Sequence, residues 1–448
     1  MAKLSEHPSV KRFNERAATA TAGPPPTLDA RELRQICLDA GADDVGFVEV
    51  DRAELANERA DILKFFPHTK SLISFALRMN REPIHNPARS VANVEFHHTG
   101  ERVNETAHRI VATLERRNVR SVNPAMGFPM EVARGVGTKL WVVSHKAVAV
   151  AAGLGHMGIH RNVIHPRFGN FILLGTVAID AKITEYQHPL DYNPCVECKL
   201  CVSACPVGAI GSDGAFNFSA CYTHNYREFL GGFTNWVEQI ADSKDGSDYR
   251  QRVTDAESAS MWQSLSFGAN YKSAYCMAVC PAGDDVIAPF LTDRSEYLRD
   301  VVRPLQDMEE TVYVVPNSDA EEYVARRFPH KHARPVANGL NRVRSIPAFL
   351  NGLPLTFQRN RSKGLDATYQ FTFTGSEEYR ATIMISNQTL AVKDGHVGKA
   401  DLQVTADSGT WLGFVAKERN LAWALLRRKI RLQGSPRLLL AFGRCFPS

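Results

Sequence analysis

The sequence predicts a multidomain protein of the α/β and α+β classes. Its 448 residues are enough for about three domains of ordinary size. Strand and helix signals alternate over residues 27–190, as in an α/β domain. Seven of the nine cysteines lie between Cys195 and Cys280, and the last hundred residues change to short strands of alternating polarity. We therefore expect three successive segments of different construction.

The amino-terminal segment begins with a polar stretch, residues 1–26, which ends in three prolines and is expected to form a flexible tail. A helix is then predicted to start with Thr27 or Asp29 as its N-cap and to stop at Gly41. The other elements expected in this domain are buried strands at 45–50, 72–77 and 171–179 and a helix at 103–114.

Composition narrows the class of protein. Fifty-three Lys and Arg against 48 Asp and Glu give a net charge of +5, too small a basic excess to predict a stable nucleic-acid partner. Apolar residues make up 44% and charged residues 23%, which is ordinary for a globular protein. No apolar stretch reaches the length of a transmembrane helix, and the first 26 residues carry no signal-peptide core. A cytoplasmic protein is expected.

The cysteine spacing indicates iron–sulfur binding. Cysteines gathered in one part of such a chain suggest metal ligands rather than disulfides, whereas Cys37 and Cys445 are expected to be buried structural thiols. The strongest motif is Cys195-x2-Cys198-x2-Cys201-x3-Cys205-Pro206. Its short gaps let one loop supply three corners of a cluster, and the fourth cysteine serves a neighbouring cluster. A structural zinc site is the alternative, but zinc rarely uses this run followed by proline.

A second, incomplete motif lies downstream. Cys276-x3-Cys280-Pro281 has the same ending, but Ser273 stands where another cysteine would complete it, and Cys221 stands alone upstream. Crossed pairing, as in two-cluster ferredoxins, gives one cluster Cys195, Cys198, Cys201 and Cys280 and the other cluster Cys205, Cys221 and Cys276. The open corner of the second cluster has four alternatives: the Ser273 oxygen, a histidine such as His224, solvent, or no iron, as in a three-iron cluster.

A glycine motif precedes the cysteines. The motif is Gly153-x-Gly155-x-x-Gly158, and Asp180 lies 22 residues after Gly158. This pattern has the form of a dinucleotide-binding fingerprint. That fold needs a helix of about ten residues after the third glycine, and Pro166 interrupts the segment almost at once. We therefore expect these glycines to let the backbone approach a large flat ligand, or to form a tight turn.

These motifs together resemble a known family. The residues that carry the resemblance are Ala152–Gly158, then Ile164–Asn170, Leu174-Gly175 and Asp180, running without a gap into the cysteine motif. Over about residues 30–290 the chain resembles the corrinoid-dependent iron–sulfur reductases, which are the epoxyqueuosine reductases and reductive dehalogenases. The resemblance implies a nitroreductase-like α/β domain that holds cobalamin beside a ferredoxin-like module with two clusters. It also implies that Gly153, Gly155, Gly158 and His156 contact the cofactor.

The chain departs from that family at two places. The position aligned with the catalytic aspartate of epoxyqueuosine reductases is Lys139, and their Gly-Lys-Asn is here Gly158-Ile159-His160. Lys139 is the candidate proton donor, because a buried ammonium readily gives up its proton; the alternative is a solvated residue at the edge of a strand. The departures count against tRNA as the substrate.

The carboxy-terminal segment resembles a sterol carrier protein of type two. The resemblance rests on 364–373, 400–407, Trp411 and Trp423, and it implies a sheet and helices around an apolar tunnel. Phe414, Trp423, Leu425 and Leu426 are candidate tunnel residues, with ordinary core positions as the alternative. The Asp394-Gly395 pair predicts a hairpin turn.

The expected domains are a tail at 1–26, a corrinoid-binding-like α/β domain at 27–190, a ferredoxin-like domain at 191–290, a connector at 291–345 and a sterol-carrier-like lipid-binding domain at 346–448. The function expected is a cobalamin-dependent reductase of a hydrophobic small molecule, similar to reductive dehalogenases, that takes electrons from a ferredoxin or flavodoxin type of donor. One alternative is an electron carrier with a lipid-binding domain and no corrinoid, and a weaker one is a tRNA epoxyqueuosine reductase.

Overall fold

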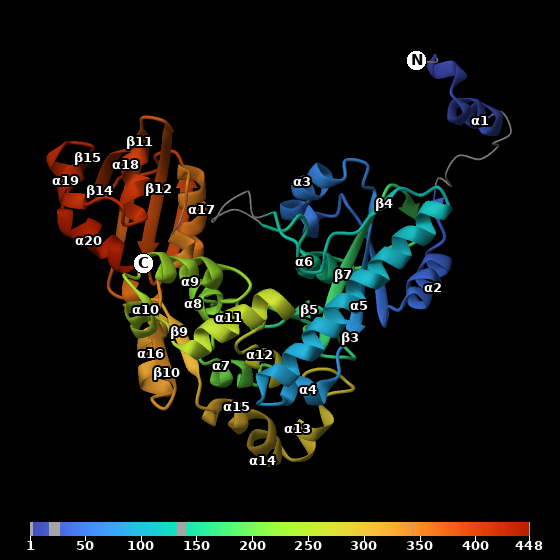
Figure 1. The fold of residues 1–448 in the computed structure, drawn as a ribbon, viewed down its shortest axis with the longest axis horizontal. Coiled ribbons are helices and arrows are strands. Elements are labelled where there is room, and N and C mark those ends of the chain that lie inside the picture. Colours follow the sequence, from blue (N-terminus) through green and yellow to red (C-terminus); the bar gives the residue numbers. More distant parts are fainter. Residues whose placement is uncertain (1–2, 18–26, 132–139, 342, 448) are drawn as a thin grey trace.

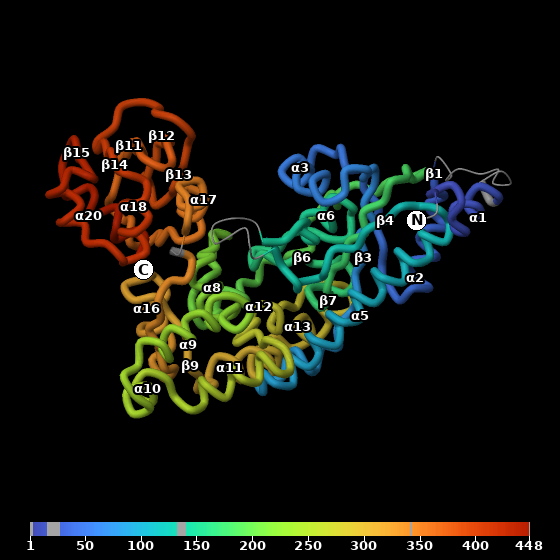
Figure 2. The backbone as a smooth tube through the Cα atoms, turned by 45° about the horizontal axis from the view of Figure 1, so that its top comes forward, coloured from blue at the N-terminus to red at the C-terminus, as the bar shows by residue number. Residues whose placement is uncertain are grey.

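The computed structural model describes residues 3–17, 27–131, 140–341 and 343–447. An α/β domain and a carboxy-terminal α+β domain form two lobes, and the cysteine-rich module lies between them (Figures 1 and 2). The predicted mixed α/β multidomain class is confirmed. None of the described helices has the length and apolar character needed to cross a membrane.

The amino-terminal lobe is built on a four-stranded antiparallel sheet with the order β2-β3-β7-β4. These strands span Asp44–Glu49, Ser71–Arg78, Ile172–Ile179 and Ser121–Val122. Helices α2 (Ala30–Ala40) and α5 (Arg89–Arg116) cover one face. Helix α6 (His145–Ala151) and the side chain of Ile62 from α3 (Ala56–Phe65) cover the other. The strands are continuous apolar runs because both faces are buried.

Local signals set the limits of these elements. Asp29 caps α2 by accepting hydrogen bonds from the backbone N–H groups of Arg31 and Glu32. The helix ends at Gly41, whose φ of 119° favours glycine. A parallel pair, β1 (Thr27–Leu28) with β8 (Lys182–Ile183), ties the start of the domain to its end. Within the expected tail, helix α1 spans Pro8–Ala17 and stands apart from the lobe (Figure 1).

The central module is helical around its cysteines. Helix α7 (Leu200–Ala204) packs against α12 (Tyr275–Ala278). The polar segment between them forms α8 (Phe218–His224), α9 (Gly231–Ala241), α10 (Gly246–Arg252) and α11 (Asp255–Phe267). We call α9–α11 the inserted helices. The module continues through α13 (Ala288–Thr292), α14 (Arg294–Tyr297), a π-helical turn (Leu298–Val302) and α15 (Arg303–Asp307).

The segment expected to be a connector is folded. Strands β9 (Thr311–Val314) and β10 (His332–Pro335) pair in parallel, and α16 (Asp319–Arg327) crosses between them. Val312 and Val314 are buried against Cys201 and Cys205, so this unit forms part of the cysteine module's core.

The carboxy-terminal domain has a five-stranded sheet with the order β13-β12-β11-β14-β15. The strands span Thr389–Asp394, Tyr379–Ser386, Ala367–Thr374, Leu402–Asp407 and Ile430–Gly434. Its helices are α17 (Ile346–Thr356), α18 (Ser408–Val415), α19 (Leu421–Leu426) and α20 (Pro436–Arg444). Tyr369, Phe371 and Phe373 alternate toward the core, where they meet Trp411.

The hairpin prediction in this domain is wrong in its position. Strands β12 and β13 turn at Asn387 and Gln388, which both have positive φ, and Gly395 instead follows the end of β13. Two left-handed residues suit a tight hairpin turn, and asparagine tolerates that conformation better than most residues.

Candidate iron–sulfur site

Four thiols meet around one small cavity. Cys195, Cys198, Cys201 and Cys280 all line it. The first motif wraps there because Glu197 and Lys199 adopt positive φ, which turns the chain twice before α7 begins at Leu200. Cys280 arrives from the residues just after α12, which packs on α7. We call these four residues the first thiol group.

Three further thiols form the second thiol group, Cys205, Cys221 and Cys276. Cys205 is buried in one apolar cluster with Cys201, and Cys221 and Cys276 pack against that cluster. Burial and the neighbouring Cys205 thiol raise the pKa of Cys276 to about 12. Burial, followed by the Cys276 thiol, raises the pKa of Cys201 to about 12. The two groups therefore adjoin, and protons must leave when a metal binds them.

The groups match the pairing expected from the sequence, and their role as cluster ligands stays a prediction. Thiolates are the donors that iron–sulfur clusters use, so the donor set fits. Among the described residues, no three His, Cys, Asp or Glu side chains lie close enough to hold one metal ion. The outlying Cys37 and Cys445 are fully buried in the cores of the two outer domains.

The contacts around the open corner involve Asn225. Its Oδ1 accepts hydrogen bonds from the Ser273 hydroxyl (3.1 Å) and the Ala274 backbone N–H (2.7 Å), at the start of α12. His224 Nδ1 accepts from the Tyr313 backbone N–H (3.4 Å). Burial, reinforced by the charge of Lys272, lowers the pKa of His224 to about 3, so this ring is neutral. The Ser273 hydroxyl is therefore hydrogen-bonded to Asn225, and the His224 ring carries no charge.

The amino-terminal domain presents Lys146 to the second thiol group. Lys146 Nζ donates to the Arg161 carbonyl (2.7 Å) and to Asn162 Oδ1 (2.8 Å). Asn162 Nδ2 lies 4.0 Å from the Cys276 sulfur. The lysine charge acts to lower the pKa of both Cys221 and Cys276. Sequence reasoning missed Lys146, because its only local signal is one cation in an Ala/Val-rich helix.

Replacing Lys146 with methionine is expected to lower the reduction potential of the second cluster by about 50–100 mV. A nearby cation stabilises the added electron, so its removal makes reduction harder. Lys146→Arg should retain the potential, and Lys182→Met, at an exposed position of β8, should leave it unchanged. Electron paramagnetic resonance during an anaerobic redox titration measures both clusters. Equal potentials in the wild type and Lys146→Met would contradict this role.

The glycine motif is shaped by contacts within the chain. A Cβ at Gly153 would collide with the His188 carbonyl oxygen, and one at Gly158 would lie 2.7 Å from His160 Cε1. The motif itself runs into a hairpin of β5 (His156–Met157) and β6 (Val163–Ile164), where a dinucleotide fold needs a long helix. These contacts account for the glycines as turn and packing positions.

Gly155 and His156 complete the predicted cofactor-binding set, and Asp180 and Lys139 are the other two residues that the sequence singled out in this domain. A Cβ at Gly155 would lie 2.5 Å from the Ile164 carbonyl oxygen. His156 is half-buried, and its Nδ1 lies 3.2 Å from the Met157 carbonyl. Asp180 accepts a hydrogen bond from Arg120 Nε (2.6 Å), which gives this acid a structural role. Lys139, the predicted proton donor, lies outside the described residues.

Residues 165–169 form a seam with the cysteine module. The backbone N–H groups of Asp284 and Asp285 donate to the carbonyls of Pro166 and Arg167, both at 2.9 Å. His165 holds the turn, because its Nδ1 accepts from the Arg167 and Phe168 N–H groups and its Nε2 donates to Asp44 (2.9 Å). The seam follows Cys280 directly, so it joins the first thiol group to the amino-terminal lobe.

The carboxy-terminal domain lines a partly open, largely apolar cavity of about 830 Å³, within the range of small-molecule sites. Phe414 lines it, as predicted, together with Phe349, Trp411 and Phe442. Trp411 is 1% exposed, and its indole N–H has no hydrogen-bond partner among the described residues. Two predicted tunnel residues are wrong: Trp423 and Leu426 are 59% and 75% exposed, because α19 turns that face to solvent, whereas Leu425 packs on the core.

Family models match two parts of the chain. Residues 188–211 match the 4Fe-4S binding domain, and residues 353–447 match the SCP-2 sterol transfer family. These matches confirm the iron–sulfur interpretation of the first cysteine motif and the sterol-carrier resemblance of the last domain.

Curated relatives with similar sequences are epoxyqueuosine reductases. That of Cellulophaga algicola is 31% identical over 103 residues, which is 21% of this chain and 33% of the relative. That of Staphylococcus aureus is 36% identical over 80 residues, covering 18% and 20%. The predicted resemblance is confirmed, and the chain spans a third or less of the length of these relatives.

Solved structures of an epoxyqueuosine reductase and a reductive dehalogenase have only low similarity to this chain. An epoxyqueuosine reductase from Streptococcus thermophilus has 15% identity and a TM-score of 0.35, over 72% of this chain and 80% of that one. A catabolic reductive dehalogenase has 14% identity and a TM-score of 0.38, over 62% and 35%.

Proposed function

We propose that this protein is an iron–sulfur reductase whose clusters deliver electrons to the amino-terminal domain. The observation that carries the proposal is the pair of adjoining thiol groups, the second of which meets Lys146 and Asn162 of that domain. Electrons enter from a low-potential donor of ferredoxin or flavodoxin type. Clusters held by the two thiol groups would supply one-electron carriers between that donor and the amino-terminal domain.

Cobalamin and a nitroreductase-like fold for the amino-terminal domain are part of the proposal through the resemblance alone. Bound cobalamin supplies a metal that can be reduced stepwise and can reduce a substrate. Gly153, Gly155 and Gly158 do not form an open cradle for it, because the chain itself fills the space beside each glycine. Lys139 remains the candidate proton donor because of its aligned position.

The proposed substrate is a hydrophobic small molecule, as in reductive dehalogenation. The apolar cavity of the carboxy-terminal domain and its SCP-2 match support this class. A second candidate is reduction of epoxyqueuosine in tRNA, which the sequence similarity to epoxyqueuosine reductases supports at least as well.

Anaerobic reconstitution with iron and sulfide, with and without hydroxocobalamin, tests the proposal. Iron and cobalt are counted, and turnover is measured with a low-potential donor on halogenated aromatic compounds and on epoxyqueuosine-containing tRNA. Conversion of either substrate supports a reductase and selects between the candidates. Protein that is reduced but converts neither substrate counts against both candidates and favours the electron-carrier alternative, and protein that holds zinc contradicts the cluster assignment.

Replacing Ser273 with cysteine is expected to supply the missing thiol of the second cluster. The side chain stands at the position that completes the C-x2-C spacing, so a four-iron cluster should form there in higher yield. Iron content should rise or stay at its maximum, and the second cluster's resonance signal should change. The matched control is Ser203→Cys, on α7, where a half-buried hydroxyl donates to the Leu200 carbonyl. An identical signal in Ser273→Cys and the wild type would place residue 273 outside the cluster.

A further inference from the structure

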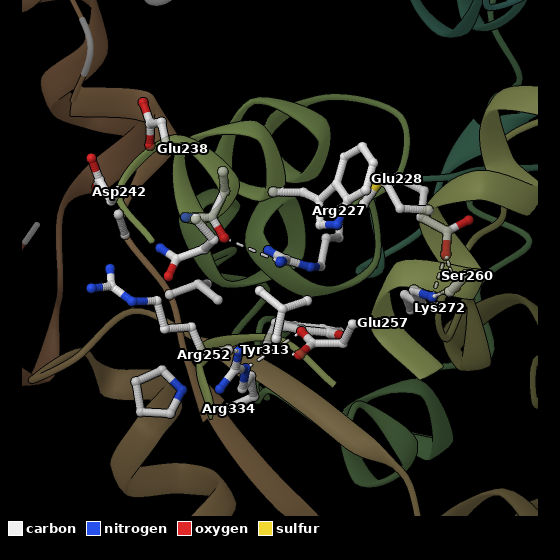
Figure 3. A pocket seen from close by; sticks show the side chains of 18 of the residues that line it. Arg227, Glu228, Glu238, Asp242, Arg252, Glu257, Ser260, Lys272, Tyr313 and Arg334 are labelled. Carbon is white, nitrogen blue, oxygen red and sulfur yellow. Dashed lines mark hydrogen bonds and ion pairs between the residues drawn. The ribbon is translucent and has the colours of Figure 1, made fainter. Parts of the chain in front are cut away.

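A polar cavity of about 530 Å³ lies beside the inserted helices. Its walls come from α9, α10 and α11, from β9 and β10, and from Lys417 of the carboxy-terminal domain. It has no part in the thiol groups or in the proposed electron path. Figure 3 shows Arg227 in its middle, with Glu238 and Asp242 on one side and the Lys272–Glu228 pair on the other.

Most charges in this cavity already have partners. Glu228 pairs with Lys272 and also accepts from the Ser260 hydroxyl (2.7 Å) and the Asn270 backbone N–H (2.9 Å). Glu257 pairs with Arg334 (3.1 Å). Arg252 pairs with Asp248 outside the cavity wall.

Arg227 is different. It is 8% exposed, and its described partners are neutral: Asn235 Oδ1, at 3.2 Å from its Nη2, and the Tyr313 ring, whose centroid lies 4.0 Å from the guanidinium carbon. It forms no ion pair with any residue in the described part of the chain. The charge of Glu257 acts on Arg227, but that carboxylate is ion-paired with Arg334. A buried cation without a counter-charge in direct contact is costly, so an anion is the ligand that this position would stabilise.

The polar cavity adjoins the apolar cavity of the carboxy-terminal domain. Pro316 and Lys417 line both cavities. Gln358 connects the carboxy-terminal domain to the cysteine module. Its side chain is 1% exposed, and its Oε1 accepts hydrogen bonds from Asn217 Nδ2 (3.2 Å) and the Asp319 backbone N–H (3.0 Å). The two cavities therefore meet at Pro316 and Lys417.

We propose that the two cavities form one site for an amphiphile with an anionic headgroup. The apolar body lies among Phe349, Trp411 and Phe442, and the carboxylate or phosphate head pairs with Arg227. This site adds a binding function to the proposed reductase and does not depend on its reaction.

Binding to the full-length reconstituted protein tests the site. Calorimetry below the micelle concentration compares dodecanoate and dodecyl phosphate with dodecan-1-ol, which has the same tail and a neutral head. Both anions should bind once per chain and about tenfold more tightly than the alcohol, since a charge-assisted hydrogen bond is worth about that factor. The stronger anion identifies the head as carboxylate or phosphate. Equal affinity for the alcohol, or binding of several molecules per chain, would overturn the proposal.

Substitutions in the two cavities test whether the anionic headgroup of the ligand binds at Arg227. Arg227→Gln should remove the tenfold preference for anions and leave the affinity for dodecan-1-ol unchanged. Pro316→Phe, which narrows the boundary and keeps the arginine, should also remove the preference. Arg380→Gln, exposed on β12, is the matched control and should bind like the wild type. Iron content of each variant reports separately on the clusters. An anion preference that survives Arg227→Gln or Pro316→Phe in folded protein would refute the composite site.

Discussion

Replacing Cys280 with alanine is expected to remove about half of the iron from the anaerobically reconstituted protein. Cys280 belongs to the first thiol group although it lies 79 residues beyond Cys201 in the chain, because α12 packs on α7. The remaining cluster should be that of Cys205, Cys221 and Cys276. Iron analysis and electron paramagnetic resonance of the reduced protein measure the loss.

The division of the cysteines into two thiol groups also predicts which variants remove the signal of the same cluster. Cys198→Ala should abolish the same resonance signal as Cys280→Ala, whereas Cys221→Ala should abolish the other one, since Cys221 belongs to the second thiol group. Cys37→Ala is the matched control, because that thiol is equally buried but lies in the core of the amino-terminal sheet. If Cys280→Ala and Cys276→Ala removed the same signal, the crossed arrangement would be wrong.

The parts of the fold that sequence could predict are those fixed by local pattern. The strands expected at 72–77 and 171–179 appear as Ser71–Arg78 and Ile172–Ile179, because apolar layers on both faces of the sheet require unbroken apolar runs. The cysteine spacing likewise predicts two groups, because a loop with two-residue gaps has few ways to present its thiols.

What escaped prediction depends on contacts between distant segments. Lys146 acts on the second thiol group only because α6 lies near it, and the local sequence of α6 does not indicate this proximity. The unit β9–α16–β10 was expected to be a connector, because its four-residue strands are too short for a clear pattern. Glycines 153, 155 and 158 suggested a ligand cradle, but the atoms that require them belong to this chain.

Replacing Gly169 with alanine is expected to destabilise the protein by about 3 kcal/mol or more and to reduce cluster occupancy. Gly169 has a φ of 63°, and an added Cβ would collide with the Ala282 carbonyl oxygen across the seam. Since the Cβ is fixed rigidly to the backbone of residue 169 and the oxygen belongs to the backbone of Ala282, neither can move without separating residues 165–169 from 282–285. That separation would break the two seam hydrogen bonds donated by Asp284 and Asp285. Thermal unfolding and iron content, both measured without oxygen, report the two effects.

The control separates the steric clash from the cost of positive φ. Gly214 has a φ of 82°, and an added Cβ there would meet nothing within 4 Å. Gly214→Ala should therefore lose only about 1 kcal/mol, the ordinary cost of a left-handed alanine, and should keep its iron. The additional loss of stability in Gly169→Ala then measures the contribution of the seam contacts. If the two variants were equally stable and bound equal iron, the seam would not hold the cysteine module against the amino-terminal lobe.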